Sequence, residues 1–383
     1  MSPRSSHGET SPAAGSSPWI GPIWDHIRFQ DEALEAIREP LLAGRLPHSL
    51  LLWGPSGVGK MRTAHGLAQA LLCTAATPPC GACAGCSKVS RFLHPDLHTL
   101  RPLKSKEDPT DDPILAAYAS ERFGSIEAIP PAAVGIDRIR AIKMEASKSL
   151  VEGRCRVLLI SQADLMTSEA ANAALKIMEE PRGETFLILT VADPRRLLPT
   201  VVSRCRRIRF RALPQDYMAA VILDETGSSA ETARLAVALA DGNLPKAIQW
   251  AQEEIIQRRD EILELVAPTG GDMARVIKKA ESWGRRWDAG TAPFLAGLLG
   301  LWQQDLMRCL AGSPEEGIVH RDCLDRLHRE SKTVSIAEIR RRLELIEELV
   351  ESVQHYVNPQ LSLKAFLLAW EKGDTPDRMQ RPI

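Results

Sequence analysis

The order of apolar and polar positions predicts an α/β domain in the first part of the chain. Short apolar runs predict strands, which we place at 50–53, 96–100, 157–160, 186–191 and 208–210. Apolar residues that recur every three or four positions predict helices, which we place at 30–43, 60–73, 136–150 and 168–180. Because strands alternate with helices, we expect a three-layer α/β fold around a parallel sheet.

After Pro214 the pattern becomes helical almost throughout. We therefore predict an α/β domain at 19–212, a small helical lid at 213–262 and a helical bundle at 263–383. Residues 1–18 are rich in Ser, Pro and Gly, and we expect them to be disordered. Residues 103–135 lack helical periodicity and contain several prolines, so we interpret them as a loop insertion.

A glycine-rich segment joins the first strand to the next helix. Its residues are Gly54, Pro55, Ser56, Gly57, Val58, Gly59, Lys60 and Met61. Backbone N–H groups in such a loop point at phosphate oxygens, the following helix adds its positive end, and the lysine reaches the outer phosphates. Met61 replaces the Ser or Thr that would bind magnesium, and a thioether is a poor ligand for a hard cation. We predict a phosphate-binding-loop fold and leave ATP binding open, because the loop could also merely connect strand and helix.

The carboxyl end of the strand at 157–160 lacks the acids that ATP hydrolysis needs. In an ATPase of this fold, an Asp that binds magnesium and a Glu that activates water stand there. Here the two places hold Ser161 and Gln162, and an amide cannot act as a general base. We expect Asp164, further on, to cap or order the loop. Together with Met61, these residues argue against hydrolysis by this chain.

Four of the eight cysteines cluster: Cys73, Cys80, Cys83 and Cys86. Clustered cysteines in a cytosolic chain indicate a metal site rather than disulfides. Four thiolates suit tetrahedral zinc, and the small residues between them let a short loop curl around one ion. An iron–sulfur motif would add a further Cys followed by Pro, which is missing here. We predict a structural zinc module at 73–90, and the alternative is a group of unliganded thiols.

Composition and charge narrow the class of protein. The 383 residues are 44% hydrophobic and 25% charged, which is ordinary for a globular chain. Neither a run of about 18 apolar residues nor an apolar signal core occurs, so we expect no membrane association and a cytoplasmic protein. The formal net charge of -1 argues against a protein that coats DNA by bulk electrostatics.

Several motifs together resemble the AAA+ clamp-loader family of bacterial replicative DNA polymerase. The segment Pro47-His48-Ser49-Leu50-Leu51-Leu52 precedes the glycine loop, and His94-Pro95-Asp96 follows the cysteine module. The segments from Ser168 to Pro181 and from Leu198 to Cys205 complete the set. Each motif alone is weak, but the combination is specific and spans most of the α/β domain.

The resemblance implies a fold, a set of partners and one residue with a catalytic role. The fold is an AAA+ domain with an inserted zinc module, a helical lid and a C-terminal collar that holds the loader subunits in a ring. The implied partners are the gamma/tau and delta subunits, a sliding clamp and, through the assembled complex, primer–template DNA. Ser203-Arg204-Cys205 matches the motif that supplies an arginine finger to a neighbouring ATPase subunit. The alternative for Arg204 is an ion pair with a carboxylate of its own chain.

Within the family, the chain resembles a subunit that does not hydrolyse ATP. Gamma/tau subunits keep the hydroxyl residue after the lysine and the Asp-Glu pair, and this chain departs at both. Pro245 stands where the nucleotide-sensing Arg would align, with Lys246 beside it, and Thr190 is the polar residue of the other sensor region. The rival interpretations are a hydrolysing gamma/tau-type subunit and a zinc-ribbon nucleic-acid binder with a decayed phosphate loop.

Overall fold

The computed structural model describes residues 27–102, 133–181, 183–284, 291–354 and 358–372. The chain consists of two compact units, and the boundary between them falls between Ala212 and Leu213. The predicted tail at 1–18 and most of the predicted insertion at 103–135 lie outside the described residues.

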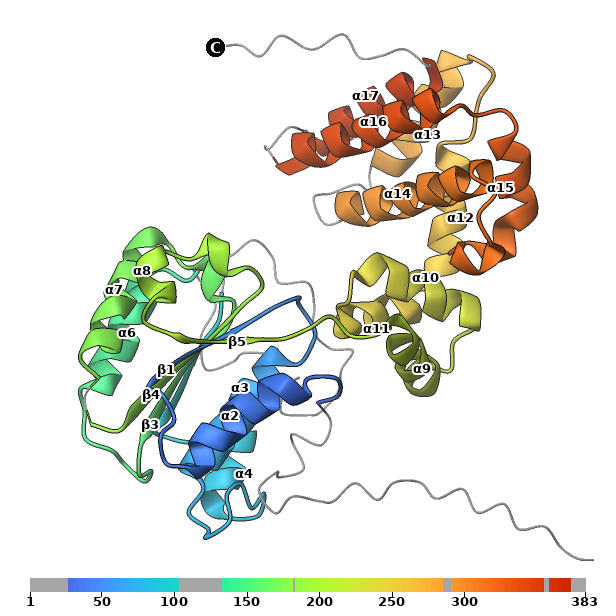
Figure 1. Ribbon diagram of the computed structural model, residues 1–383. Coiled ribbons are helices and arrows are strands. Elements are labelled where there is room, and N and C mark those ends of the chain that lie inside the picture. The colour runs from blue at the N-terminus through green and yellow to red at the C-terminus, as the bar shows by residue number, and fades with distance from the viewer. Residues whose placement is uncertain (1–26, 103–132, 182, 285–290, 355–357, 373–383) are drawn as a thin grey trace, which may run out of the picture. The chain divides into compact units, whose positions relative to one another are not determined.

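A five-stranded parallel sheet forms the centre of the first unit (Figure 1). In chain order its strands are β1 (Ser49–Trp53), β2 (Leu97–Leu100), β3 (Arg156–Ile160), β4 (Thr185–Val191) and β5 (Arg206–Arg209). Their spatial order is β2-β3-β4-β1-β5, and every neighbouring pair is parallel. Strands β3 and β4 are buried along their whole length, as continuous apolar runs require. The prediction of an α/β fold with a parallel sheet is confirmed.

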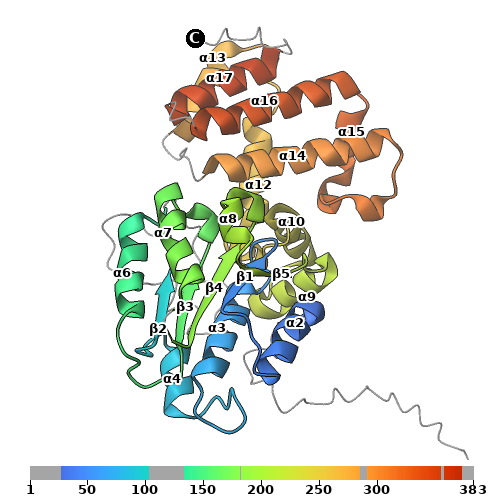
Figure 2. The same cartoon turned by 60° about the vertical axis from the view of Figure 1, so that its left-hand side comes forward.

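Helices cover both faces of this sheet (Figures 1 and 2). On one face, α6 (Ile136–Ala146), α7 (Ser168–Glu179) and the short α8 (Pro199–Val202) share an apolar core with β1, β3 and β4. On the other face lie α2 (Asp31–Leu42) and α3 (Lys60–Leu72). Because the strands are parallel, the turns at the carboxyl ends of β1 and β3, where the candidate chemistry stands, lie at the same edge of the sheet, on either side of the end of β4.

One helix is shorter than its sequence pattern predicted. We expected it to reach residue 150, but α6 ends at Ala146. The buried guanidinium of Arg156 donates hydrogen bonds to the carbonyl oxygens of Ala146, Lys148 and Ser149. These bonds satisfy the carbonyls at the helix end with a side chain from β3, so the chain turns there instead of continuing the helix.

The cysteine segment is more regular than we predicted. We expected a short loop curled around an ion, but the segment contains the helix α4 (Ala84–Ser90). Cys83 caps this helix, because its Sγ accepts a hydrogen bond from the N–H of Cys86. The segment has too few apolar residues for a helical period to be visible in the sequence.

The described part of the second unit is helical (Figure 1). Its α-helices are α9 (Gln215–Thr226), α10 (Ala230–Ala240), α11 (Leu244–Gln252), α12 (Ile255–Leu265), α13 (Met273–Gly284), α14 (Thr291–Leu310), α15 (Leu324–Ser331), α16 (Ile336–Gln354) and α17 (Pro359–Lys372). The helical C-terminal region is thereby confirmed, whereas its division into lid and bundle stays a prediction. Among the described residues, no helix has the length and apolar character that crossing a membrane would require.

Candidate functional site

The glycine loop between β1 and α3 depends on backbone conformations that suit glycine. Gly54, Gly57 and Gly59 have φ angles of 142°, 76° and 103°. Gly54 also lies directly against the residue that follows β5, since a Cβ atom there would be 2.2 Å from the carbonyl oxygen of Phe210. The loop is therefore fixed to the edge of the sheet as well as to β1 and α3.

We expect Gly54→Ala to lower the free energy of unfolding by about 3 kcal/mol, because the added methyl group meets backbone that cannot move aside. Gly44→Ala is the matched control. Its φ is 61°, but no atom lies within 4 Å of an added Cβ, so only the cost of a left-handed residue, about 1 kcal/mol, is expected. Urea denaturation of both variants measures the difference, and equal losses would contradict the close approach at Gly54.

Lys60 begins α3 and folds back onto the loop. Its side chain is 9% exposed, and its Nζ donates hydrogen bonds to the carbonyl oxygens of Gly54 and Pro55. Burial lowers the pKa of Lys60 to about 8, while the negative charge of Asp164 acts in the opposite direction. A phosphate bound here would have to draw Lys60 away from those carbonyls. Met61 is buried beside it and offers no oxygen to a magnesium ion.

The residues that replace the two expected acids are built into the end of the sheet. Gln162 donates its N–H to Oγ1 of Thr190 at 3.2 Å, and Ser161 donates its N–H to the carbonyl of Leu100 at 2.7 Å. Both therefore stand at the carboxyl end of β3, as predicted, without a carboxylate. We had expected Asp164 only to order the loop, whereas its charge acts on Lys60.

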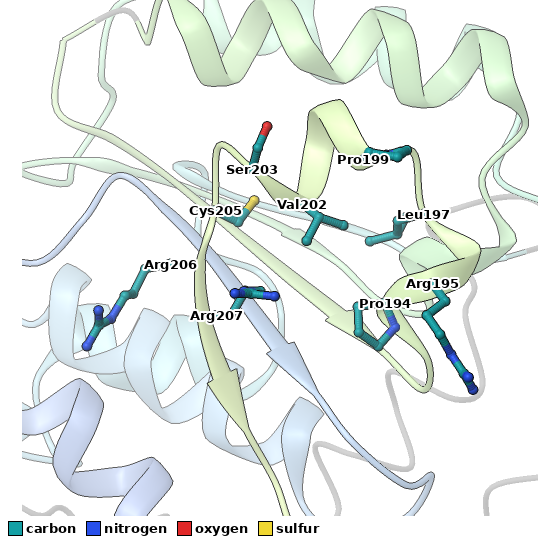
Figure 3. A pocket seen from close by; sticks show the side chains of 9 residues that line it. All are labelled: Pro194, Arg195, Leu197, Pro199, Val202, Ser203, Cys205, Arg206 and Arg207. Atoms are coloured by element: carbon teal, nitrogen blue, oxygen red, sulfur yellow. The ribbon is translucent and has the colours of Figure 1, made fainter.

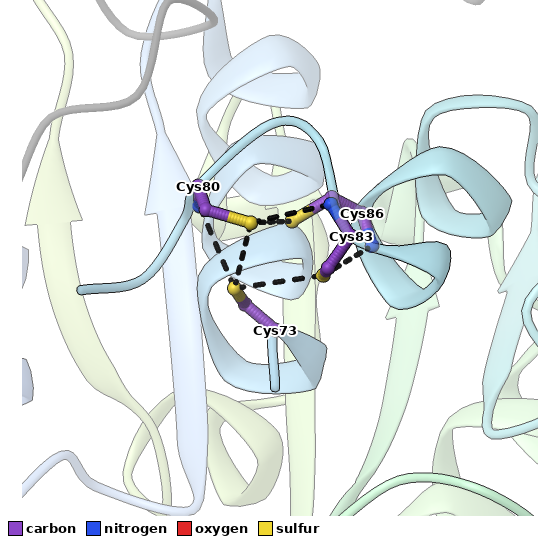
Figure 4. A group of neighbouring side chains, drawn as sticks. All are labelled: Cys73, Cys80, Cys83 and Cys86. Carbon is purple, nitrogen blue, oxygen red and sulfur yellow. Dashed lines mark hydrogen bonds between the residues drawn. The ribbon is translucent and has the colours of Figure 1, made fainter. Parts of the chain in front are cut away.

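The four clustered cysteines converge on one point (Figure 4). The sulfur of Cys73 lies 3.6 Å from that of Cys80 and 3.8 Å from that of Cys83, and the sulfurs of Cys80 and Cys86 are 3.9 Å apart. All four lie within 4.8 Å of one another. A tetrahedral zinc ion with Zn–S bonds of about 2.3 Å would hold its sulfurs about 3.8 Å apart. The donor set and its spacing therefore fit a single tetrahedral ion such as zinc.

Backbone N–H groups prepare these sulfurs to bind a metal. The N–H of Ala75 donates to Cys73, that of Cys83 to Cys80, and that of Cys86 to Cys83. Burial raises the pKa of Cys83, but hydrogen bonds, including the one from the N–H of Cys86, outweigh this effect. The net result is a pKa of about 5. Burial raises the pKa of Cys86, so its thiolate needs a cation beside it.

Side chains of helix α3 hold the cysteine module by hydrogen bonds to its backbone. Gln69 donates to the carbonyl of Cys86 at 3.2 Å, and Nε2 of His65 lies 2.6 Å from the carbonyl oxygen of Val89. The ring of His65 also stacks on Phe92, with the ring centres 4.2 Å apart. The module is thus anchored to the helix that begins at the glycine loop.

Arg204 is paired within its own chain, which is the alternative that the sequence left open. Its guanidinium lies 2.6 Å from Oε1 of Glu179 and donates a hydrogen bond to the carbonyl of Thr200. The two charged side chains are 40% and 46% exposed, so the ion pair stabilises the fold by less than about 1 kcal/mol. A stronger anion from a neighbouring molecule could therefore displace Glu179.

An open hollow of about 880 Å³ lies beside α8 (Figure 3). Its lining residues are Pro194, Arg195, Leu197, Pro199, Val202, Ser203, Cys205, Arg206 and Arg207. Three of these are arginines and none is acidic. Our sequence reasoning missed this surface, although arginines at neighbouring positions of an edge strand were a visible signal.

The second sensor region lies in the helical unit, at the start of α11. Asn243 caps this helix by accepting the N–H of Lys246 at 3.2 Å. The Lys246 ammonium group lies 4.4 Å from the centre of the Trp250 ring, and burial lowers the pKa of this lysine. Pro245 offers no side-chain charge, and its neighbour Lys246 is held against the Trp250 ring.

Comparison with known proteins shows similarity to subunits of DNA polymerase III. A family model described as DNA polymerase III, delta subunit, matches residues 29–214. The delta-prime subunit from Bacillus subtilis is 28% identical over 239 residues, which cover 62% of this chain and 64% of that relative. The delta-prime subunit from Pseudomonas aeruginosa is 29% identical over 285 residues, which cover 72% of this chain and 77% of that one. The chain is thus similar to delta-prime subunits of DNA polymerase III from several bacteria.

Gamma/tau subunits are similar to the chain as well. The gamma/tau subunit of Mycobacterium bovis is 29% identical over 198 residues, which cover 50% of this chain and 29% of that protein. Among solved structures, a gamma-subunit-related protein from Thermotoga maritima covers 89% of this chain at 14% identity, with a TM-score of 0.44. The delta-prime match also spans less than two thirds of the Bacillus subtilis relative, at 64% of its length.

Proposed function

We propose that this chain acts as the delta-prime subunit of a DNA polymerase III clamp loader, which helps to load a sliding clamp onto primed DNA in the cytoplasm. In this proposal residues 19–212 are the AAA+ domain, 213–262 the lid and 263–383 the collar that joins gamma/tau and delta subunits. The matching family model and the relatives named as delta-prime and gamma/tau subunits support it.

The chain contributes no ATP hydrolysis of its own in this proposal. The observation that carries it is the state of the phosphate loop: Lys60 is turned onto the carbonyls of its own loop, and Met61 offers no hydroxyl beside it. At the end of β3, Ser161 and Gln162 supply neither a magnesium ligand of carboxylate type nor a general base. Nucleotide could bind through the N–H groups of the loop, but its terminal phosphate would not be split.

Zinc binds in the cysteine module in this proposal. Cys73, Cys80, Cys83 and Cys86 would hold it, and four protein ligands leave no open position for a reacting molecule. When bound, the ion supplies a cross-link between the end of α3 and the start of α4. The chain's own residues do the rest, since Gln69 and the N-cap of α4 orient the thiolates.

Arg204 acts in trans in this proposal. Its exposed guanidinium leaves Glu179 and reaches the terminal phosphate of ATP bound to a neighbouring gamma/tau subunit, where it stabilises the charge that develops during transfer. In this proposal the chain contributes the guanidinium of Arg204 to catalysis, and α8, which ends two residues before it, positions this side chain.

Reconstitution tests the proposal. We expect the purified full-length chain to join gamma/tau and delta subunits from the same organism in one complex, whose mass is measured by native mass spectrometry. The complex should load the sliding clamp onto primed DNA faster than gamma/tau and delta alone, which serve as the control. Failure to enter the complex, or clamp loading that is the same without this chain, would contradict the proposed function.

A further inference from the structure

The outer edge of β5 is a row of arginines with an open backbone. Strand β5 is the last strand of the sheet, next to β1. The N–H of Phe210 donates to the carbonyl of Trp53, so the backbone groups of every second residue of β5 point at β1. Those of Arg207 and Arg209 point the other way, and among the described residues they have no hydrogen-bond partner in the chain.

Within the described part of the chain, this edge is closed at Arg211. At Arg211, the side-chain amide of Gln30 imitates a neighbouring strand: its Nε2 donates to the carbonyl of Arg211, and its Oε1 accepts the N–H of Arg211, both at 2.9 Å. Gln30 is 3% exposed, so this pairing is a fixed part of the fold. Where the pairing by Gln30 stops, the edge is free to accept an extended segment of another molecule.

The side chains along this open edge select for negative charge. Arg207 and Arg209 stand two residues apart on β5 and therefore lie on the same face of the sheet. The guanidinium of Arg209 is held 5.3 Å from the centre of the Trp53 ring. Arg207 is one of the residues that line the hollow, and the apolar residues Pro194 and Leu197 line it as well (Figure 3).

We propose that the open β5 edge and the hollow beside it form a docking surface for an extended, acidic segment of a protein partner. The segment adds to β5 as a further strand through the free backbone groups of Arg207 and Arg209. Its acidic side chains, at every second position, pair with the two guanidinium groups, and apolar side chains between them enter the hollow. An arginine row could also serve only to keep sheet edges apart, and the test separates the two roles.

A short fluorescent peptide in which Glu and Val alternate is the probe for this surface. With the full-length chain we expect saturable binding that weakens as salt is added, and about tenfold weaker binding by R207A/R209A. Arg196→Ala is the control for the loss of a nearby surface arginine, because Arg196 is exposed but does not line the hollow, and it should bind as the parent protein does. No saturable binding, or equal binding by R207A/R209A, would overturn the proposal.

Main-chain pairing is tested by removing a backbone donor. Arg209→Pro deletes an N–H that points away from β1, so an edge strand tolerates it, whereas Arg209→Ala keeps that donor. We expect Arg209→Pro to bind the peptide at least about tenfold more weakly than Arg209→Ala does. A peptide with N-methylated backbone should also fail on the unaltered protein, which keeps the test independent of folding of the proline variant.

The other possible occupants give different results. If a single-stranded oligonucleotide competes for the surface and binds more tightly than the peptide, the site is for a nucleic acid and the proposal is wrong. If the protein forms a dimer in sedimentation that Arg209→Pro dissociates, a second copy of the chain occupies the edge and the proposal is equally wrong. Slower hydrogen exchange at the N–H groups of Arg207 and Arg209 with the peptide bound would support it.

Discussion

Arg204→Ala is expected to slow ATP turnover by the assembled complex while leaving assembly intact. At the site that receives this guanidinium, the loss should be on the order of 10³-fold, the range known for arginine fingers. The surface pair with Glu179 stabilises the subunit too weakly for its loss to unfold the chain. Steady-state ATP hydrolysis and native mass measure turnover and assembly in the same sample.

Glu179→Ala is the control that separates the two roles of Arg204. It breaks the same ion pair but leaves the guanidinium in place, so turnover should stay close to that of the unaltered complex. If both variants slow turnover equally, the ion pair and not a finger is what matters. Unchanged turnover with Arg204→Ala would remove the role in trans.

Cys86→Ser is expected to abolish stoichiometric zinc binding and to unfold the module around α4. Cys86 is fully buried, so its sulfur cannot be replaced by water or by another ligand at the surface. Binding of structural zinc supplies on the order of 10 kcal/mol to the folding of small modules, so its loss exceeds what the hydrogen bonds of His65 and Gln69 can offset. Metal analysis and hydrogen exchange across residues 73–90 measure the two effects.

Cys309→Ser is the matched control for this prediction. Cys309 is half-buried in the helical unit and belongs to no group of metal-binding side chains in the described part of the chain. It should keep one zinc ion per chain and normal protection of residues 73–90. Zinc content that is unaffected by Cys86→Ser would contradict the proposed site.

The elements that could be predicted are those whose signal lies within a few residues. Strands β3 and β4 are continuous apolar runs, and the spacing of the four clustered cysteines alone predicts a metal site. The glycine loop is recognisable because its shape requires glycine at fixed places, of which Gly54 is the most constrained. In each case the local sequence and the final environment demand the same residue types.

The features that were missed depend on contacts between distant parts of the chain. Nothing near residue 146 shows that α6 ends there, because the group that binds its last carbonyls is Arg156 on β3. The edge of β5 is closed by Gln30, which lies 181 residues away in sequence. The influence of Asp164 on Lys60 likewise arises only when two strand ends meet. Local patterns carry no information about such pairs.

ATP hydrolysis by the purified chain alone, with magnesium, tests the central claim most directly. The missing hydroxyl at Met61 and the missing acid at Gln162 predict no turnover above that of a Lys60→Ala variant, which reports any contaminating ATPase. Turnover at the rate of a gamma/tau-type ATPase, lost on Lys60→Ala substitution, would show that the chain hydrolyses ATP itself and would contradict the account.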